Sequence, residues 1–137
     1  MKGTIQQVKA AMKGNEFKKI RVLSESSNVD EIITRVKEIT QIPGIKFQFA
    51  EIRHDLGKIP NDPNRDEFYP LTIYAQDGIR ICVSEVRCGY HGASTYAMIE
   101  ILKMIGVNLT VHDEEEIYNS PHRYERTFRI SSDAKIY

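Results

Sequence analysis

The chain has 137 residues and a mass of 15.8 kDa, which suits one domain, residues 1–137, around one core. Hydrophobic residues make up 41% of the sequence and charged residues 28%, an ordinary globular balance. Nineteen basic residues stand against nineteen acidic ones. This neutrality argues against binding to duplex nucleic acid or to an anionic membrane, so any recognition of an anion has to be local.

The sequence indicates a soluble, cytoplasmic protein. No stretch approaches the roughly 20 apolar residues of a membrane span, and the N-terminus lacks the apolar core of a signal peptide. Cys82 and Cys88 lie on one predicted strand, about 20 Å apart, which is too far for a disulfide. Two reduced thiols are typical of a cytosolic protein.

The first half of the chain predicts two helices and two strands. Ile5, Val8 and Met12 have helical spacing, and the run ends at Gly14-Asn15. "FKKIRVLSE", residues 17–25, reads as a strand. A second helix follows a capping box of Ser27 with Asp30; its apolar face comprises Ile32, Ile33, Val36 and Ile39, and Pro43-Gly44 ends it.

A half-buried strand is predicted over residues 45–53, where Ile45, Phe47 and Phe49 alternate with polar residues. Residues 54–70 form a long loop, which in a small domain is either functional or a solvent excursion. Asp77-Gly78 lies between two β-rich runs and fits a type I′ hairpin turn. The sheet is therefore at least partly antiparallel.

The remaining elements are one buried helix, a short mixed segment and a last strand. The helix through Ile105 is apolar nearly all round, with Ser94 and Thr95 as candidate N-caps and Gly106 at C′. Residues 107–119 predict a short strand and a helical turn, and residues 123–131 a strand. The expected class is α+β, with a mainly antiparallel sheet, a buried central helix and flanking amphipathic helices.

The turn before the buried helix, "RCGYHGAST", is a candidate anion site. Gly89 and Gly92 allow backbone N–H groups to point inward, and the helix N-terminus adds partial positive charge. The side chains expected to contribute charge, stacking or hydrogen bonds are Arg87, Tyr90, His91, Ser94 and Thr95. A turn whose glycines only satisfy backbone geometry explains the pattern equally well.

The last strand offers possible partners for this turn. Alternation places Tyr124, Arg126, Phe128 and Ile130 on one face of the strand. Arg126 or Arg123 is a candidate phosphate ligand, and Phe128 a candidate surface for base stacking. The alternative is that Phe128 and Ile130 face the core while the arginines are solvated edge residues.

No constellation in the sequence requires catalysis or a metal. The four histidines lack the spacing of a zinc site, and a solvated acidic turn explains "HDEEE" after residue 111. Cys88 reads as a small buried strand-end residue. His54 and Asp55 are sequence neighbours, and on a strand they point to opposite faces. No catalytic residue and no cofactor is expected.

The run "YPLTIYAQDGIRICVSEVRCGYHGASTYAMIEILKMIGV", residues 69–107, resembles small phage proteins of the Thoeris anti-defence type. Those proteins are sponges that sequester cyclic ADP-ribose isomers, and in some cases cyclic oligonucleotides, produced by bacterial immune systems. The resemblance implies an α+β fold, a dimer or higher homo-oligomer, ligand pockets between subunits and release of intact ligand on denaturation. His91 and Ala93 depart from the glycines expected in such turns.

The leading hypothesis from the sequence is therefore a phage sponge for a cyclic nucleotide signal, acting in the host cytoplasm for immune evasion. In this hypothesis the amides of residues 89–95 and Arg87 hold one phosphate. Two alternatives stay open. The chain fits a protein-binding inhibitor such as an immunity protein, and it also fits a small nucleotide-processing enzyme that uses His54 or His91.

Overall fold

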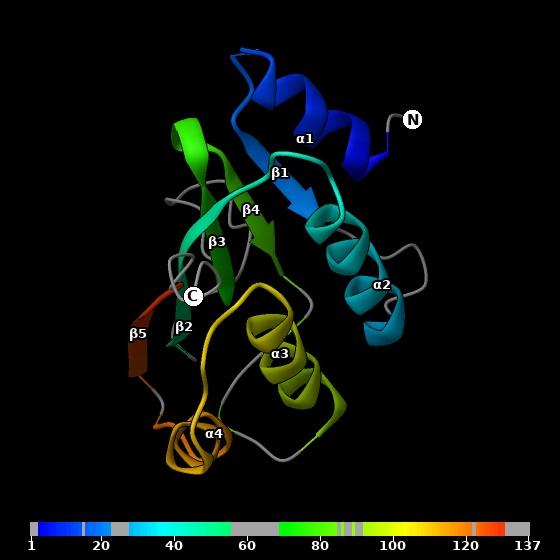
Figure 1. Ribbon diagram of the computed structural model, residues 1–137. Coiled ribbons are helices and arrows are strands. Elements are labelled where there is room, and N and C mark those ends of the chain that lie inside the picture. Colours follow the sequence, from blue (N-terminus) through cyan, green and yellow to red (C-terminus); the bar gives the residue numbers. More distant parts are fainter. Residues whose placement is uncertain are drawn as a thin grey trace.

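The fold comes from a computed structural model, which describes residues 3–14, 16–22, 28–55, 69–84, 86, 89, 92–121 and 123–130. Figure 1 shows the elements along the chain. In order they are α1 Thr4–Met12, β1 Lys19–Val22, α2 Val29–Thr40, β2 Phe47–Asp55, β3 Leu71–Ala75, η1 Gln76–Gly78, β4 Arg80–Val83, α3 Ala93–Met104, α4 Val111–Tyr118 and β5 Arg123–Arg129.

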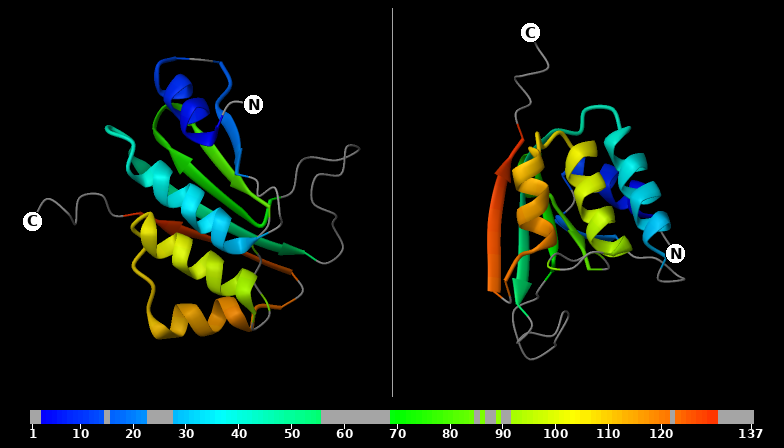
Figure 2. Two further views of the ribbon diagram at one scale, coloured as in Figure 1. Left: turned by 90° about the vertical axis from the view of Figure 1, so that its right-hand side faces the viewer. Right: turned by 90° about the horizontal axis from the view of Figure 1, so that it is seen from below.

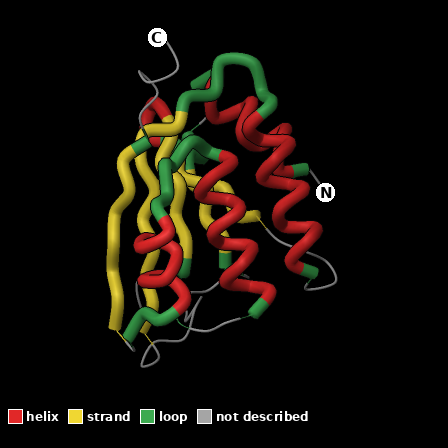
Figure 3. The backbone as a smooth tube through the Cα atoms, turned by 60° about the horizontal axis from the view of Figure 1, so that its bottom comes forward, coloured by secondary structure: helices red, strands yellow, loops and turns green. Residues whose placement is uncertain are grey.

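The five strands form one sheet in the order β1-β4-β3-β2-β5. β1 runs parallel to β4, and the other three neighbouring pairs are antiparallel. The helices pack on one side of this sheet, with α2, α3 and α4 side by side and α1 close to β1 (Figure 2, Figure 3). The predicted α+β class with a mainly antiparallel sheet is confirmed.

The strand registers show which residues face the helices. One row of directly opposed residues crosses all five strands, and each member is at most 6% exposed: Ile20, Ile81, Ile73, Ala50 and Phe128. Since side chains alternate along a strand, the next residue of each strand points to the opposite face. Within the part of the chain that the structure describes, no helix covers that opposite face.

The predicted buried helix is α3. Its side chains at Ala97, Met98, Ile101 and Leu102 are fully buried, and it packs between α2 and α4. The helix ends as predicted, because the N–H groups of Gly106 and Val107 donate to the carbonyls of Lys103 and Leu102 and Gly106 has a φ of +106°. This is a Schellman motif.

The β3–β4 hairpin has the turn that the sequence predicted. Asp77 adopts φ 58° and ψ 27°, and Gly78 a φ of 78°, as a type I′ turn requires at its two central positions. The N–H of Ile79 donates to the carbonyl of Gln76 at 3.1 Å. The strands pair Tyr74 with Arg80, one residue away from the register that a two-residue turn alone would give, because the N–H of Gln76 donates to the carbonyl of Lys46 instead of to β4.

Three predictions, two about helix starts and one about a short strand, are corrected. α2 is capped by Asn28, whose side chain accepts from the N–H of Asp30 at 2.9 Å; Ser27 lies outside the described residues. α3 begins after Gly92, so neither Ser94 nor Thr95 is its N-cap. Residues 107–110 form no strand, and α4 follows them with a capping box of Thr110 and Asp113.

The phase of β2 also differs from the predicted alternation. The register against β3 shifts between Phe47 and Phe49, as a β-bulge produces. Phe47 packs partly against the core, whereas Phe49 is paired with Tyr74 on the uncovered face. The two phenylalanines were expected on one face. The bulge reverses the alternation between them.

Candidate functional site

The turn before α3 is held by a backbone contact at Gly89. Its N–H donates to the carbonyl of Ile117, at the end of α4, at 2.8 Å. That amide is thus engaged within the protein, as the packing interpretation requires. Its predicted partners Arg87, Tyr90 and His91, together with Cys88, lie outside the described residues, so their roles stay predictions.

Gly89 is also closely packed by side chains. Its φ is +91°, and a Cβ added to it would lie 2.5 Å from Cε1 of His54 and 3.1 Å from Oγ of Ser120. Both distances are shorter than an ordinary van der Waals contact. The position therefore needs glycine for its conformation and for space, whether or not the turn binds an anion.

Two hydroxyls near this turn stand out because they are buried and have no hydrogen-bond partner among the described residues. They are Oγ1 of Thr95, in the first turn of α3, and Oγ of Ser120; the two residues are 0% and 8% exposed. Buried hydroxyls in proteins usually have partners. Gly92, the N-cap of α3, provides no side-chain cap, and Ser94 is partly exposed.

Arg126 does not have the free guanidinium that phosphate binding needs. It forms ion pairs with Asp113 at 2.8 Å and Glu116 at 3.0 Å, both on α4. Glu116 also accepts a hydrogen bond from the hydroxyl of Tyr124. The four residues Asp113, Glu116, Tyr124 and Arg126, called the α4–β5 cluster below, join the last strand to the helix layer.

The α4–β5 cluster shifts the acid–base properties of its members. The N–H of Thr110 and then Arg126 hold the pKa of Asp113 below its usual value. The Tyr124 hydroxyl and Arg126 do the same for the pKa of Glu116. Burial and the hydrogen bond to Glu116 raise the pKa of Tyr124 to about 12. These pKa shifts are those expected where the charge of Arg126 is neutralised by carboxylates in a structural cluster.

The structure also corrects the role predicted for Phe128. It is 6% exposed in the central row of the core, and the guanidinium carbon of Arg126 lies 4.4 Å from its ring centroid. Its ring therefore offers no free surface to a base. Arg123 is exposed but lies at the opposite end of β5 from Arg129, about 20 Å away along the strand. The predicted β5 residues do not form one site.

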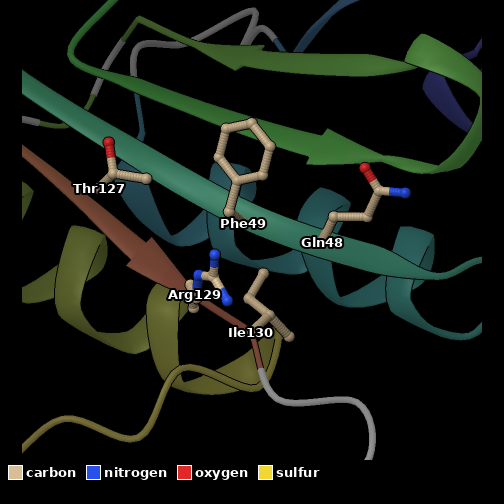
Figure 4. A pocket seen from close by; sticks show the side chains of 5 residues that line it. All are labelled: Gln48, Phe49, Thr127, Arg129 and Ile130. Carbon is tan, nitrogen blue, oxygen red and sulfur yellow. The ribbon is translucent and has the colours of Figure 1, made fainter.

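A pocket lies instead on the uncovered face, between β2 and β5. It has a volume of roughly 380 Å³ and is lined by Gln48, Phe49, Thr127, Arg129 and Ile130. Figure 4 shows Phe49 at its centre, with Arg129 and Ile130 from the end of β5 beside it. Phe49 and Arg129 are directly opposed across the two strands. The pocket thus combines an aromatic ring with a cation.

The ring of Phe49 is held in place by a second aromatic residue. It stacks on Tyr74 of β3, with ring centroids 4.3 Å apart and planes inclined by 17°. Arg129 is exposed, and within the described part of the chain it forms no ion pair. Sequence reasoning missed the pocket, because the bulge that turns Phe49 toward Arg129 leaves no local pattern.

Comparisons with protein-family models, with curated proteins and with solved structures found no match to this chain. Within the described residues, no three His, Cys, Asp or Glu side chains are grouped as metal ligands would be. None of the described helices has the length and apolar character needed to cross a membrane.

Proposed function

We propose that this protein binds a nucleotide without altering it, and that the base and a phosphate occupy the pocket between β2 and β5. The observation that carries the proposal is the direct opposition of Phe49 and Arg129 on a sheet face that no described helix covers. A nucleotide has an aromatic base and an anionic phosphate joined by a short linker. The pocket presents the complementary pair of groups.

Each side chain has a definite part in this proposal. The base stacks on Phe49, continuing the stack that Tyr74 begins, and base–aromatic stacking contributes about 1–3 kcal/mol. The guanidinium of Arg129 holds the phosphate with two parallel hydrogen bonds. Thr127 and Gln48 line the same pocket and supply a hydroxyl and an amide for the sugar or the base edge.

The pocket favours a binding protein over an enzyme. Its five lining residues are Gln48, Phe49, Thr127, Arg129 and Ile130, side chains that stack, hydrogen-bond or carry a fixed charge rather than exchange protons near neutral pH. Together with the resemblance to anti-defence sponges, this supports a cyclic nucleotide signal as the ligand. A cyclic ADP-ribose isomer and a cyclic oligonucleotide each supply a base and phosphate.

The test is ligand capture. The purified protein is mixed with cyclic ADP-ribose isomers, cyclic di- and trinucleotides and AMP, the bound fraction is isolated and heated, and the released ligand is analysed. Intact recovery supports a sponge. A chemically altered ligand would indicate an enzyme, and absence of any capture would overturn the proposal and favour a protein-binding inhibitor.

Two variants locate the site. Arg129→Gln removes the charge and should weaken capture by roughly tenfold or more, since a hydrogen bond to a charged group contributes about 1.5–3 kcal/mol. Phe49→Leu keeps an apolar side chain but removes the stacking face. The matched control is Arg35→Gln on α2, where Arg35 pairs with Glu31 at 2.8 Å. Equal capture by Arg129→Gln and Arg35→Gln would exclude this pocket.

A further inference from the structure

We infer that the site continues from this pocket across the whole sheet and accepts single-stranded nucleic acid of several nucleotides. The inference rests on the proposed function, because the first nucleotide occupies the same pocket. It depends on a second row of opposed residues, one step along the strands from the core row. This row, called the open row below, comprises Lys19, Arg80, Tyr74, Phe49 and Arg129.

The open row has cations at both edges of the sheet and aromatic residues between them. Two aromatic residues lie in the middle, on β3 and β2. Arg80 is directly opposed to Tyr74, and Arg129 to Phe49. Residues opposed in this way have their Cβ atoms about 5 Å apart on the same face. A stacking surface is therefore flanked by a cation on each side.

The charges of the open row complement a phosphate backbone. Arg80 is exposed like Arg129, and neither forms an ion pair among the described residues. The ammonium of Lys19 lies 5.3 Å from the ring centroid of Tyr69, at the β1 edge. Although the whole chain has no net charge, this row is locally cationic.

Acidic side chains on the same face lie outside the open row. Glu51 is opposed to Thr127 in the neighbouring row. Glu125 accepts a hydrogen bond from Nε of Arg53 at 2.9 Å, which neutralises it. The aromatic pair thus has cations as its nearest neighbours along the row, and this arrangement selects an anionic aromatic polymer over an acidic or apolar protein.

The dimensions set the length of the ligand. Four strand spacings separate β1 from β5, about 19 Å at the usual distance between strands. Nucleotides stacked at about 3.4 Å per step cover this distance with roughly six residues, and an extended strand needs fewer. A single strand also leaves its bases free to stack on aromatic side chains, which a duplex does not.

The experiment measures affinity against length, using labelled thymidylate oligomers of one, three, six and twelve nucleotides and a uridylate series as the RNA arm. We expect affinity to rise up to three to six nucleotides and then to level off. The two exposed arginines, Arg80 and Arg129, also predict a slope of about −1.4 in log K against log salt for the hexamer. Binding is compared for wild type and for Arg80→Gln, Arg129→Gln and Arg35→Gln, after urea denaturation confirms that all four are folded.

The variants separate this inference from the proposed function. Arg80→Gln should leave mononucleotide affinity unchanged while weakening the hexamer roughly tenfold, and Arg129→Gln should weaken both. Capture of single nucleotides with no gain at six, and no effect of Arg80→Gln, would overturn the extended site and leave the pocket standing. Hexamer binding that both variants weaken, without capture of any cyclic nucleotide, would support the extended site and overturn the sponge.

Discussion

Gly89 lies against the imidazole of His54, so closely that a Cβ at position 89 would be 2.5 Å from Cε1 of that ring. Gly89→Ala therefore introduces two penalties, an unfavourable positive φ and a steric clash. The backbone term costs about 1–2 kcal/mol, and the clash adds to it. We expect a loss of more than 2 kcal/mol in the free energy of unfolding measured with urea.

The matched control for this substitution is Gly14→Ala. Gly14 has a similar φ of +101°, and a Cβ added to it meets nothing within 4 Å. It should show the backbone penalty alone. Equal losses in the two variants would mean that the His54 ring moves aside without cost and that the turn before α3 is not tightly packed.

The buried hydroxyl of Thr95 provides a test of the turn itself. Thr95→Val removes a hydroxyl that has no hydrogen-bond partner within the described part of the chain and keeps nearly the same shape. Removing an unsatisfied buried polar group stabilises a fold by about 1–3 kcal/mol. We therefore expect a higher thermal midpoint. If Thr95→Val instead leaves the fold intact and abolishes nucleotide capture, the hydroxyl is a ligand contact and the anion site lies at this turn.

Thr110→Val is the corresponding control, because the Thr110 hydroxyl accepts from the N–H of Asp113 at 3.0 Å as the N-cap of α4. Loss of such a cap destabilises a protein by about 1 kcal/mol. The two threonine variants should therefore change the thermal midpoint in opposite directions. A decrease for both would show that Thr95 has a partner in solution.

The α4–β5 cluster should make the fold sensitive to acid. Asp113 and Glu116 have folded pKa values below their ordinary 3.8 and 4.5, so their contribution is present above those values. It is lost as the pH falls through the lowered ones. The free energy of unfolding should consequently decrease as the pH is lowered from 5 toward 3.

The double variant Asp113→Asn, Glu116→Gln isolates this contribution. It removes both carboxylates that neutralise Arg126 and should cost roughly 1 kcal/mol at pH 7, the scale of partly exposed ion pairs. Its stability should change less between pH 5 and pH 3 than that of wild type. An unchanged acid dependence would place the responsible carboxylates elsewhere in the chain.

Tyr124 provides a spectroscopic marker of the same cluster. Its folded pKa of about 12, against an ordinary 10, means that its phenol ionises after those of exposed tyrosines when pH is raised. Its contribution to stability is present below pH 10 and is lost as the pH rises through 12. The difference in ultraviolet absorbance between wild type and Tyr124→Phe should show this transition. A transition near pH 10 would mean that neither the burial of the phenol nor its bond to Glu116 is maintained.

The elements set by local chemistry were predicted well from the sequence. Asp77-Gly78 determines its turn through backbone conformations available to those two residues. The many apolar residues between Tyr96 and Ile105 identify a buried helix without further information. Asn28 shows the limit, because Ser27 is an equally good cap one residue earlier. Local chemistry cannot choose between two adjacent caps when packing decides where the helix begins.

The candidate site was less accessible to sequence reasoning. Arg126 was predicted as a phosphate ligand from residue type, yet Asp113 and Glu116 reach it from α4, a helix that was expected as a strand and a turn. Phe49 and Arg129 are 80 positions apart in the chain, and only the register of β2 on β5 opposes them. Contacts between distant segments depend on tertiary pairing, which leaves no short-range periodicity.

The bulge in β2 has a consequence for how this sheet can vary between related genes. The bulge reverses the alternation between Phe47 and Phe49. Insertion or deletion of one residue beside Gln48 therefore leaves the apolar residues before it facing the helix layer. The residues on the two faces of β2 can therefore change independently during evolution. The residues of the face opposite the helices can change while those of the core stay the same.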